Sequence, residues 1–324
     1  MRNFTANYNH SIPVKLGAVD IGSNAIRFQV SKIIDVNGMV LFKKMEYVRF
    51  PLRLGEDVFK MGEISAGKEA KFLKLIQTFK NLFDLYEVDD YIICATSAMR
   101  EARNGKDIAF KVKDLLGVQI DIIDGDKEAE LINTVLYNEL DDSSYVHIDV
   151  GGGSTEINFF VNKQKIATRS FKIGSVRRLN GLDTPEEWDE MHRWIEEQTN
   201  KAPKPITAIG TGGNIGKLYE LGSGDKNKKE RQLISLKKLE ETQQIIAGYT
   251  YEERVNILMM NTDRADVIIP ASDIYLNIMR WAKATKMLVP ELGLKDGLML
   301  MLYERNTNKS VAVNQVLNFN KYKK

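Results

Sequence analysis

The sequence has little of what marks a secreted, a membrane-spanning or a nucleic-acid-coating protein. One cysteine among 324 residues allows no disulfide within the chain, which is typical of a reducing cytoplasm. The 46 basic and 44 acidic residues leave a net charge of +2, which excludes a polycationic nucleic-acid binder. No apolar run reaches the length of a membrane span, and the first residues lack the apolar core of a signal peptide. We therefore expect a cytoplasmic protein without a nucleic-acid or membrane partner.

The length and composition favour two structural cores. A chain of this length with 43% hydrophobic residues exceeds the size at which single cores usually divide. Basic residues form two short runs, at 226–231 and 321–324, which are typical of solvated surface. The alternative is that these runs guide an extended anion toward a cleft.

Residues 147–161 place three glycines between two acids and two apolar runs, a pattern that predicts strand, tight turn and strand. Because residues 151–153 lack Cβ atoms, their backbone N–H groups can form a concave nest that suits phosphate. The flanking Asp149 and Glu156 suit a magnesium ion, which prefers one or two carboxylates together with phosphate oxygens. The alternative is a glycine-rich hairpin with two solvated acids.

The same order of parts occurs twice in the chain. Residues 18–30 contain Asp20 in an apolar strand, then a small-residue turn and an alternating strand, as residues 147–161 do. The segments 91–100 and 206–215 both run from a strand through small residues toward a helix. Two similar α/β halves are therefore predicted, with related turns facing each other across a cleft and a ligand at the carboxyl ends of the strands.

Local signals predict further elements in the first half. Asn37-Gly38 indicates a hairpin turn between two strands. Residues 53–64 show no sustained period and predict a loop, which ends at Ser65, a helix N-cap. Residues 97–104 predict a helix that follows a buried strand.

Two charged side chains near helix starts are candidates for chemistry. Arg100 lies one turn into a helix that follows a strand, where its planar guanidinium can bind phosphate oxygens. The alternative is an exposed arginine with a salt-bridge partner. Glu128 lies in the first turn of a helix that begins after residues 124–125. It is either a general base aimed at water in the cleft or a carboxylate that interacts with the helix dipole.

Together these residues resemble the exopolyphosphatase and guanosine pentaphosphate phosphohydrolase family, within the superfamily of actin, sugar kinases and heat-shock ATPases. The resemblance covers nearly the whole chain. It rests on seven segments in family order, at residues 20–24, 95–100, 125–129, 149–156, 210–213, 264–266 and 293–297.

The expected fold is α/β, with two similar ribonuclease-H-like lobes, as in actin-like ATPases, and a cleft between them. We expect the first lobe at residues 1–124, joined by the C-terminal tail at 305–324, and the second lobe at 125–304. The resemblance also suggests a homodimer.

The resemblance implies roles for individual residues. Glu128 serves as catalytic base, and Arg100 with the glycine-rich turns grips the terminal phosphate. Asp149 and Glu156, joined by Asp20, organise magnesium, the expected cofactor. The expected phosphate-binding residues are Gly22, Ser23, Asn24, Gly151, Gly152, Gly153, Ser154, Thr155, Gly212 and Gly213.

Three positions depart from the family pattern. Ala25 replaces a hydroxyl residue, Asn214 replaces threonine and Ala271 replaces glycine. These changes remove polar contacts around phosphate without touching the expected base or metal carboxylates, so we expect retained activity with an altered substrate preference. The chain also ends without the additional helical domain of longer members, which favours shorter polymers.

The predicted reaction is release of terminal orthophosphate from inorganic polyphosphate or guanosine pentaphosphate, by in-line attack of water assisted by magnesium. A sugar-kinase-type or actin-like ATPase would share the lobes but would bind adenosine and transfer phosphate from ATP. A sensor that binds an alarmone with little hydrolysis is another interpretation, favoured by Ala25 and Asn214. The sequence does not separate polymer from nucleotide.

Overall fold

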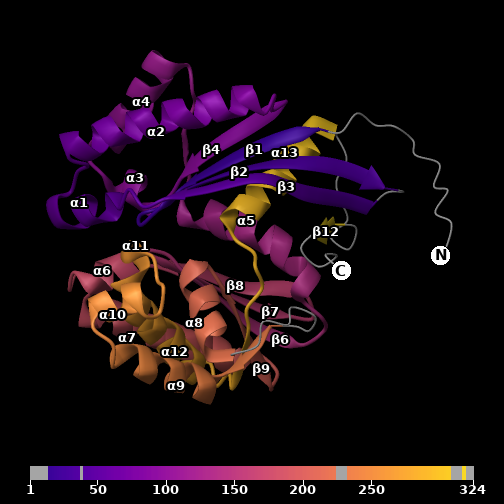
Figure 1. Cartoon of the computed structure of the whole chain (residues 1–324). Helices are drawn as coiled ribbons and strands as arrows, with labels where there is room; N and C mark the ends of the chain where they lie inside the picture. The colour runs from indigo at the N-terminus through magenta and orange to yellow at the C-terminus, as the bar shows by residue number, and fades with distance from the viewer. Residues whose placement is uncertain (1–13, 37–38, 224–231, 308–315, 319–324) are drawn as a thin grey trace.

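The chain folds into two α/β halves, each built on a six-stranded sheet (Figure 1). This computed structural model describes residues 14–36, 39–223, 232–307 and 316–318. The basic runs at 226–231 and 321–324 and the turn at 37–38 lie outside the described residues. No helix in the described ranges is long and apolar enough to cross a membrane.

The first sheet has the strand order β12-β3-β2-β1-β4-β5. Its strands are β1 Lys15–Ile21, β2 Ile26–Val36, β3 Met39–Phe50, β4 Asp90–Ala95, β5 Asp121–Ile122 and β12 Val316–Asn318. The helices of this half are α1 Leu54–Met61, α2 Ala66–Leu85, α3 Ser97–Glu101 and α4 Gly105–Leu116.

The second sheet has the strand order β10-β11-β9-β6-β7-β8. Its strands are β6 Ser144–Val150, β7 Thr155–Val161, β8 Gln164–Phe171, β9 Ile206–Thr211, β10 Leu233–Ser235 and β11 Lys286–Leu288. The helices of this half are α6 Ser175–Leu179, α7 Pro185–Lys201, α8 Gly213–Ser223, α9 Leu236–Ala247, α10 Tyr251–Asn256, α11 Thr262–Ala265 and α12 Ile268–Trp281.

The two sheets repeat one topology, which confirms the predicted internal duplication. In the first, β1 pairs antiparallel with β2 and parallel with β4. In the second, β6 pairs antiparallel with β7 and parallel with β9. The parallel strands of each half therefore end at one edge, and the turns that follow them meet between the halves.

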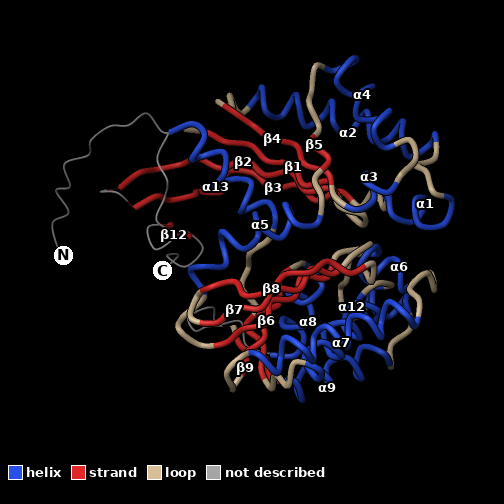
Figure 2. The backbone as a smooth tube through the Cα atoms, turned by 180° about the vertical axis from the view of Figure 1, so that it is seen from behind, coloured by secondary structure: helices blue, strands red, loops and turns tan. Residues whose placement is uncertain are grey.

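Two helices connect the halves. The helix α5, Gly125–Leu136, packs against β7 and β8 of the second sheet, and a 3₁₀ turn at Tyr137–Glu139 follows it. The helix α13, Leu294–Thr307, packs against α5 and against β1, β2 and β4 of the first sheet. Figure 2 shows both helices between the two sheets. The predicted lobe boundaries stay a prediction.

Apolar packing stabilises each half and the junction between them. The first half has a core that includes Phe28, Phe72 and Phe79, while Phe159 and Tyr275 belong to the core of the second. A third cluster joins residues of both sheets with α5 and α13. Burial of these side chains contributes about 1.5–3 kcal/mol each, so the apolar clusters hold the cleft in place.

Two local predictions were wrong. Residues 53–64 contain α1, whose Leu54 and Val58 are buried one turn apart, and Gly62 ends it with φ of 77°. Two buried apolar residues are too few to show a helical hydrophobic period in the sequence. The predicted helix at 97–104 ends at Glu101, and the separate helix α4 begins at Gly105. A Cβ atom at Gly105 would lie 2.0 Å from the Met99 carbonyl oxygen, so this tight connection requires glycine.

The predicted N-cap of α2 is confirmed. The Ser65 side chain accepts a hydrogen bond from the Lys68 backbone N–H, and the helix continues to Leu85. Phe72, Ile76 and Phe79 are buried on its inner face. The opposite face of α2 therefore lies at the protein surface.

Candidate active site

A cavity of about 830 Å³ lies between the two halves. Its wall includes the β1–β2 turn, the β6–β7 turn, the start of α8 and the loop that leads into α13. The predicted residues on this wall are Asp20, Gly22, Ser23, Asn24, Glu128, Asp149, Gly151, Gly152, Ser154, Gly212 and Gly213.

The β1–β2 turn carries its polar atoms toward the other elements of the site. The Gly22 N–H donates to the Ala25 carbonyl at 3.2 Å, which closes the turn. The hydroxyl oxygens of Ser23 and Ser97 are 2.8 Å apart, so the turn is tied to the start of α3. Asp20 accepts a hydrogen bond from Arg27 at 2.6 Å, and this ion pair is its main contact.

The β6–β7 turn lies directly against the β1–β2 turn. A Cβ atom at Gly152 would lie 2.8 Å from the Ser23 Cβ, and one at Gly153 would lie 2.3 Å from the Phe59 ring. Only glycine therefore allows the two turns to approach this closely. The Gly151 N–H donates a hydrogen bond to the Ser154 carbonyl at 2.9 Å, which fixes the shape of the turn.

Contacts of Arg177 tie the two halves together behind the glycine turn. This α6 side chain donates to the Gly153 carbonyl at 2.9 Å and pairs with Glu101 of α3 at 2.7 Å. Its guanidinium also lies 4.2 Å from the centre of the Phe59 ring on α1. Two elements of the first half, α1 and α3, therefore meet α6 and the glycine turn on this side.

Three carboxyl groups come together at the carboxyl end of β6 and the start of α5. Burial raises the pKa of Glu156 to about 7, and the charge of Asp149 adds to this effect. Burial likewise raises the pKa of Asp149 to about 6. Burial and then the charges of Glu156 and Asp149 raise the pKa of Glu128 well above its usual value. These carboxyl groups therefore hold protons more tightly than carboxyl groups in water.

The carboxyl groups differ in their hydrogen bonds. Glu156 Oε1 accepts from the hydroxyls of Ser154 at 2.7 Å and Ser170 at 2.9 Å, and it lies behind the cavity wall. Glu128 lines the cavity, and its Oε2 is shielded from solvent without a hydrogen-bond partner. A buried polar atom without a partner is unfavourable, so Glu128 Oε2 is ready to accept a proton or bind a cation.

The donor set fits a hard divalent cation of the magnesium type. Within the described ranges, no group of three or more His, Cys, Asp or Glu side chains forms a ready-made metal cage. Magnesium uses few protein carboxylates and takes its remaining ligands from phosphate and water, so a full cage is not needed. Asp149 and Glu128 offer carboxylate oxygens on the cavity wall, whereas Asp20 is already paired with Arg27.

Some predicted residues lie outside the cavity wall. Arg100 donates from Nη1 to the Ile123 carbonyl at 2.7 Å, although its charge lowers the pKa values of Glu128 and Glu156. Thr155 is fully buried, and its hydroxyl donates to the Ile173 carbonyl at 2.5 Å. The structure thus gathers the glycine turns and carboxylates at the cavity, and the predicted phosphate-binding roles of Arg100 and Thr155 stay predictions.

A sequence model described as the Ppx/GppA phosphatase family matches residues 32–306. The chain belongs to this family. The predicted family is therefore confirmed, together with the hydrolase class that its description implies.

Individual relatives extend the comparison. Over 318 residues the chain is 22% identical to exopolyphosphatase 1 of Mycobacterium leprae, a match that covers 93% of each protein. It is 25% identical to the guanosine-5'-triphosphate,3'-diphosphate pyrophosphatase of Photobacterium profundum, covering 89% of this chain and 58% of that enzyme. It is 34% identical to a bifunctional 3-dehydroquinate synthase/phosphatase of Fusobacterium nucleatum, covering 49% of this chain and 25% of that protein.

Solved structures support the fold of this Ppx/GppA chain. An exopolyphosphatase from Cytophaga hutchinsonii superposes with a TM-score of 0.77 at 22% identity, covering 94% of this chain and 99% of that one. The Aquifex aeolicus family member superposes with a TM-score of 0.73 at 22% identity, covering 92% and 100%. The predicted α/β fold with two sheets is therefore confirmed.

The structure of this Ppx/GppA chain adds cationic residues that the sequence had not singled out as binding residues. Arg27, Arg49, Arg264, Lys217 and Lys295 all line the cavity. Arg264 belongs to the recognised segment 264–266, so its motif could have indicated it. Lys295 likewise belongs to the recognised segment 293–297. The other three follow no shared sequence signal, because strands and helices distant in the chain bring them together.

A buried chain of hydrogen bonds behind Asp149 was also missed. A hydrogen bond from Thr211 lowers the pKa of Asp149. The Thr211 hydroxyl lies 2.9 Å from His147 Nε2, and the other ring nitrogen lies 2.9 Å from Asn158 Nδ2. Burial lowers the pKa of His147 to about 3, so this histidine is neutral and supports Asp149 without adding charge.

Proposed function

We propose that the protein hydrolyses the terminal phosphoanhydride bond of inorganic polyphosphate or guanosine pentaphosphate and releases orthophosphate. One observation carries this proposal: the guanidinium of Arg264 lines the cavity and has no carboxylate ion-pair partner in the described part of the chain. Burial, and then the charge of Arg49, lower its pKa. A desolvated cation of this kind favours an anionic ligand.

The position of Arg264 matches a phosphate site. A Cβ atom at Gly213 would lie 2.8 Å from Arg264 Nη2, so the guanidinium lies beside the first residue of α8. The N–H groups at the start of a helix favour an anion. Arg264 and α8 would therefore grip phosphate oxygens together, with the turns at 22–24 and 151–154 on the other sides.

Glu128 would act as the general base. As a carboxylate it accepts a proton from water, the water oxygen attacks the terminal phosphorus, and the bond to the bridging oxygen breaks. The shortened chain leaves with that oxygen, and Glu128 later returns its proton to solvent. A raised pKa makes the carboxylate a stronger base than one in water.

The remaining acceleration would come from positioning and charge. Phosphoryl transfer has a loose transition state, so fixed donors around the transferring group lower the barrier. Asp149 would help to hold a magnesium ion, which neutralises phosphate oxygens when bound, while Glu128 stays free to act as the base. Glu156 would stay behind them, oriented by the hydroxyls of Ser154 and Ser170.

The three departures from the family pattern fit the same proposal. Ala25 and Asn214 line the cavity, where they change its polar surface, and Ala271 is fully buried in α12. None of them replaces Glu128 or Asp149. We therefore keep the expectation of an active enzyme with an altered substrate preference.

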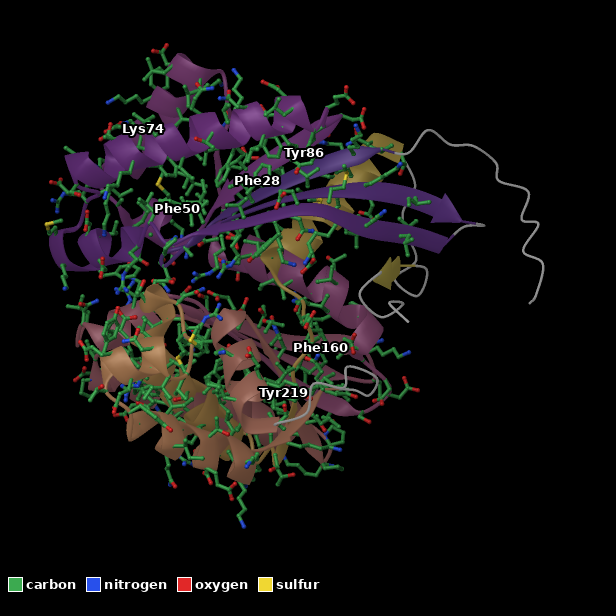
Figure 3. The ribbon with its side chains drawn as sticks, in the orientation of Figure 1. Phe28, Phe50, Lys74, Tyr86, Phe160 and Tyr219 are labelled. Atoms are coloured by element: carbon green, nitrogen blue, oxygen red, sulfur yellow. The ribbon has the colours of Figure 1, made fainter. Side chains whose placement is uncertain are left out.

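One observation favours guanosine pentaphosphate as an alternative substrate. Away from the glycine turns the cavity wall includes apolar side chains, interleaved with charged ones such as Lys217 and Lys295. The apolar residues are Tyr219, Val289, Pro290, Leu292 and Leu294. Figure 3 places Tyr219 in the second half. Inorganic polyphosphate has no apolar surface to bury there, whereas a purine base does. The relatives named as exopolyphosphatases and the one named for guanosine pentaphosphate support one candidate each.

The decisive experiment compares orthophosphate release from polyphosphates of several lengths, guanosine pentaphosphate and ATP, with magnesium and with EDTA. We expect release from polyphosphate or guanosine pentaphosphate and little from ATP. Preferred release from ATP would indicate an actin-like or kinase-type ATPase. Tight binding of guanosine pentaphosphate without release would indicate a sensor.

We also propose a cytoplasmic homodimer, following the family resemblance. Light scattering coupled to size-exclusion chromatography measures the mass of the particle directly. A mass equal to that of one chain would contradict the dimer.

A further inference from the structure

A second groove, outside the cavity, lies between the end of β3 and the outer face of α2. It has a volume of about 420 Å³. We call it the α2 groove. Its lining residues are Phe50, Pro51, Leu52, Lys68, Lys71, Lys74, Leu75 and Thr78.

The α2 groove has a cationic rim above an apolar floor. Lys68, Lys71 and Lys74 follow one another at three-residue intervals, so they lie along one side of the helix. Lys68 is fixed by Asp57 at 2.8 Å and by the Arg53 carbonyl at 2.6 Å. Long lysine stems lie along apolar surface and keep their ammonium groups in water. The groove therefore presents a row of ammonium groups.

Two of these lysines carry a charge that no carboxylate among the described residues neutralises. Lys71 and Lys74 are exposed, and neither forms an ion pair with a carboxylate in the part of the chain that the structure describes. Other lysines of the same half do pair, as Lys111 does with Glu69 at 2.7 Å. The α2 groove thus retains a net positive charge.

The α2 groove shares no lining residue with the cavity, but both border the end of β3. Tyr47 and Arg49 of β3 line the cavity, and Tyr47 is 37% exposed. The next residue, Phe50, is 40% exposed and begins the groove. Figure 3 shows Phe50 near the end of β3 and Lys74 beyond it on α2. One strand end therefore borders both spaces.

We propose that the α2 groove is a second binding site for an inorganic polyphosphate chain, which holds the part of the polymer that extends out of the cavity past Tyr47. This inference rests on the proposed function, because it takes the polymer as the substrate. The site binds chain and performs no chemistry. It increases the affinity for long polymers only, since a short polymer does not reach from the cavity to Lys71.

Charge chemistry favours this occupant over an acidic protein segment. A polyphosphate places a negative charge on every unit, so a row of lysines contacts successive units without a defined sequence of side chains. The gain from each exposed contact is modest and sensitive to salt. Linkage to the terminal phosphate in the cavity makes the second contact intramolecular, which raises its effect on affinity.

The test compares two double variants of the full chain. Lys71→Gln/Lys74→Gln removes the two unpaired groove charges. Lys106→Gln/Lys113→Gln is the matched control, because it removes two exposed lysines from α4 of the same half. Like Lys71 and Lys74, these two form no ion pair among the described residues. Both pairs are also made in a Glu128→Gln background, so that binding of fluorescent long-chain polyphosphate is measured without turnover and without added metal.

We expect the groove variant to bind long polyphosphate about three- to tenfold more weakly, with a less steep dependence on salt, and the control to bind normally. Turnover of tripolyphosphate should be unchanged in both. Equal weakening in the two variants, or an equal loss for tripolyphosphate, would overturn the proposal. If no polymer is hydrolysed by the native chain, the proposed function fails, while the binding comparison still decides the groove.

Discussion

Arg49 of β3 and Asp263 of α11 form a buried ion pair that joins the two halves of the chain. Arg49 Nη1 donates to Asp263 Oδ1 at 3.0 Å, and the second guanidinium nitrogen donates to the other carboxylate oxygen. Asn24 of the β1–β2 turn also donates to the Asp263 carbonyl at 2.8 Å. One aspartate therefore orients a cavity cation and a turn residue of the opposite half.

Asp263→Asn should destabilise the protein. It would leave the Arg49 guanidinium buried without a counter-charge, and breaking a pair of this kind costs about 3–5 kcal/mol. Denaturant unfolding measures the loss. Glu197→Gln, in the exposed pair of Glu197 with Lys201, is the control and should leave the unfolding midpoint unchanged. Equal midpoints for Asp263→Asn and the native protein would show that the pair contributes nothing to stability.

Glu128→Gln should reduce turnover by about 10²–10⁴-fold, the usual contribution of general-base catalysis, and leave substrate binding nearly intact. Glutamine has nearly the same shape but cannot accept the proton of the attacking water. Orthophosphate release and equilibrium binding measure the two effects. Glu130→Gln is the control on the same helix, where Glu130 pairs with Lys127 at the surface. A turnover close to native would remove Glu128 from the mechanism.

Arg264→Gln should weaken substrate binding by about tenfold or more, since charge-assisted hydrogen bonds to phosphate contribute about 1.5–3 kcal/mol. KM should rise more than kcat falls if the guanidinium contacts the substrate before reaction. Folding should be retained, because Arg264 forms no ion pair with a carboxylate in the described ranges and its replacement leaves no such carboxylate unpaired. Unchanged affinity for every phosphate substrate would contradict the proposed grip.

Gly152→Ala should lower kcat/KM by about tenfold or more, because a 1 Å misplacement in a phosphoryl-transfer site can cost about a hundredfold. The added Cβ would lie 2.8 Å from that of Ser23, so the turns of the two halves must separate. Gly67→Ala on α2 is the control, since its Cβ meets nothing within 4 Å. Gly67→Ala should keep full activity, and an equally active Gly152→Ala would show that the closeness of the turns is not required.

The stability of the metal-free protein should fall as the pH rises. The pKa of Glu156 is about 7 in the folded chain against a usual value of 4.5, so the folded state binds the proton more tightly than the unfolded state. This contribution is fully present below pH 4.5 and is lost as the pH rises to about 7.

Unfolding in EDTA across this pH range tests the prediction. Glu156→Gln should flatten the profile, because glutamine does not titrate. Magnesium should also flatten it if the cation binds the ionised carboxylates and offsets their repulsion. A native profile that rises with pH throughout this range would contradict the raised pKa.

Sequence reasoning reached the parts of the site that are local in the chain. Asp149 and the glycines after it lie within eight residues, and the matching turn after Asp20 repeated the pattern. Strand alternation and turn composition are nearest-neighbour properties, so they can be read from sequence. The family resemblance then gave Glu128, whose first-turn position alone left a structural interpretation open.

The rest depends on contacts between distant segments. Arg49 and Asp263 are separated by 214 positions, and no local sequence pattern predicts that they pair. The helix α1 was missed because only Leu54 and Val58 mark its buried face. Arg100 was expected at the phosphate and that role stays a prediction, but its contact with the Ile123 carbonyl, which depends on the packing of β5, could not be read from the sequence.

The contacts made by Arg177 bear on how a polymer is digested. Its contacts to Phe59, Glu101 and Gly153 join α1, α3 and α6 on that flank, behind the residues that line the cavity. We propose that the cavity is blind on that flank, so that a linear polymer enters it by one end only. Digestion should therefore shorten every strand by single units, giving an evenly spaced ladder on a gel with no mid-length fragments.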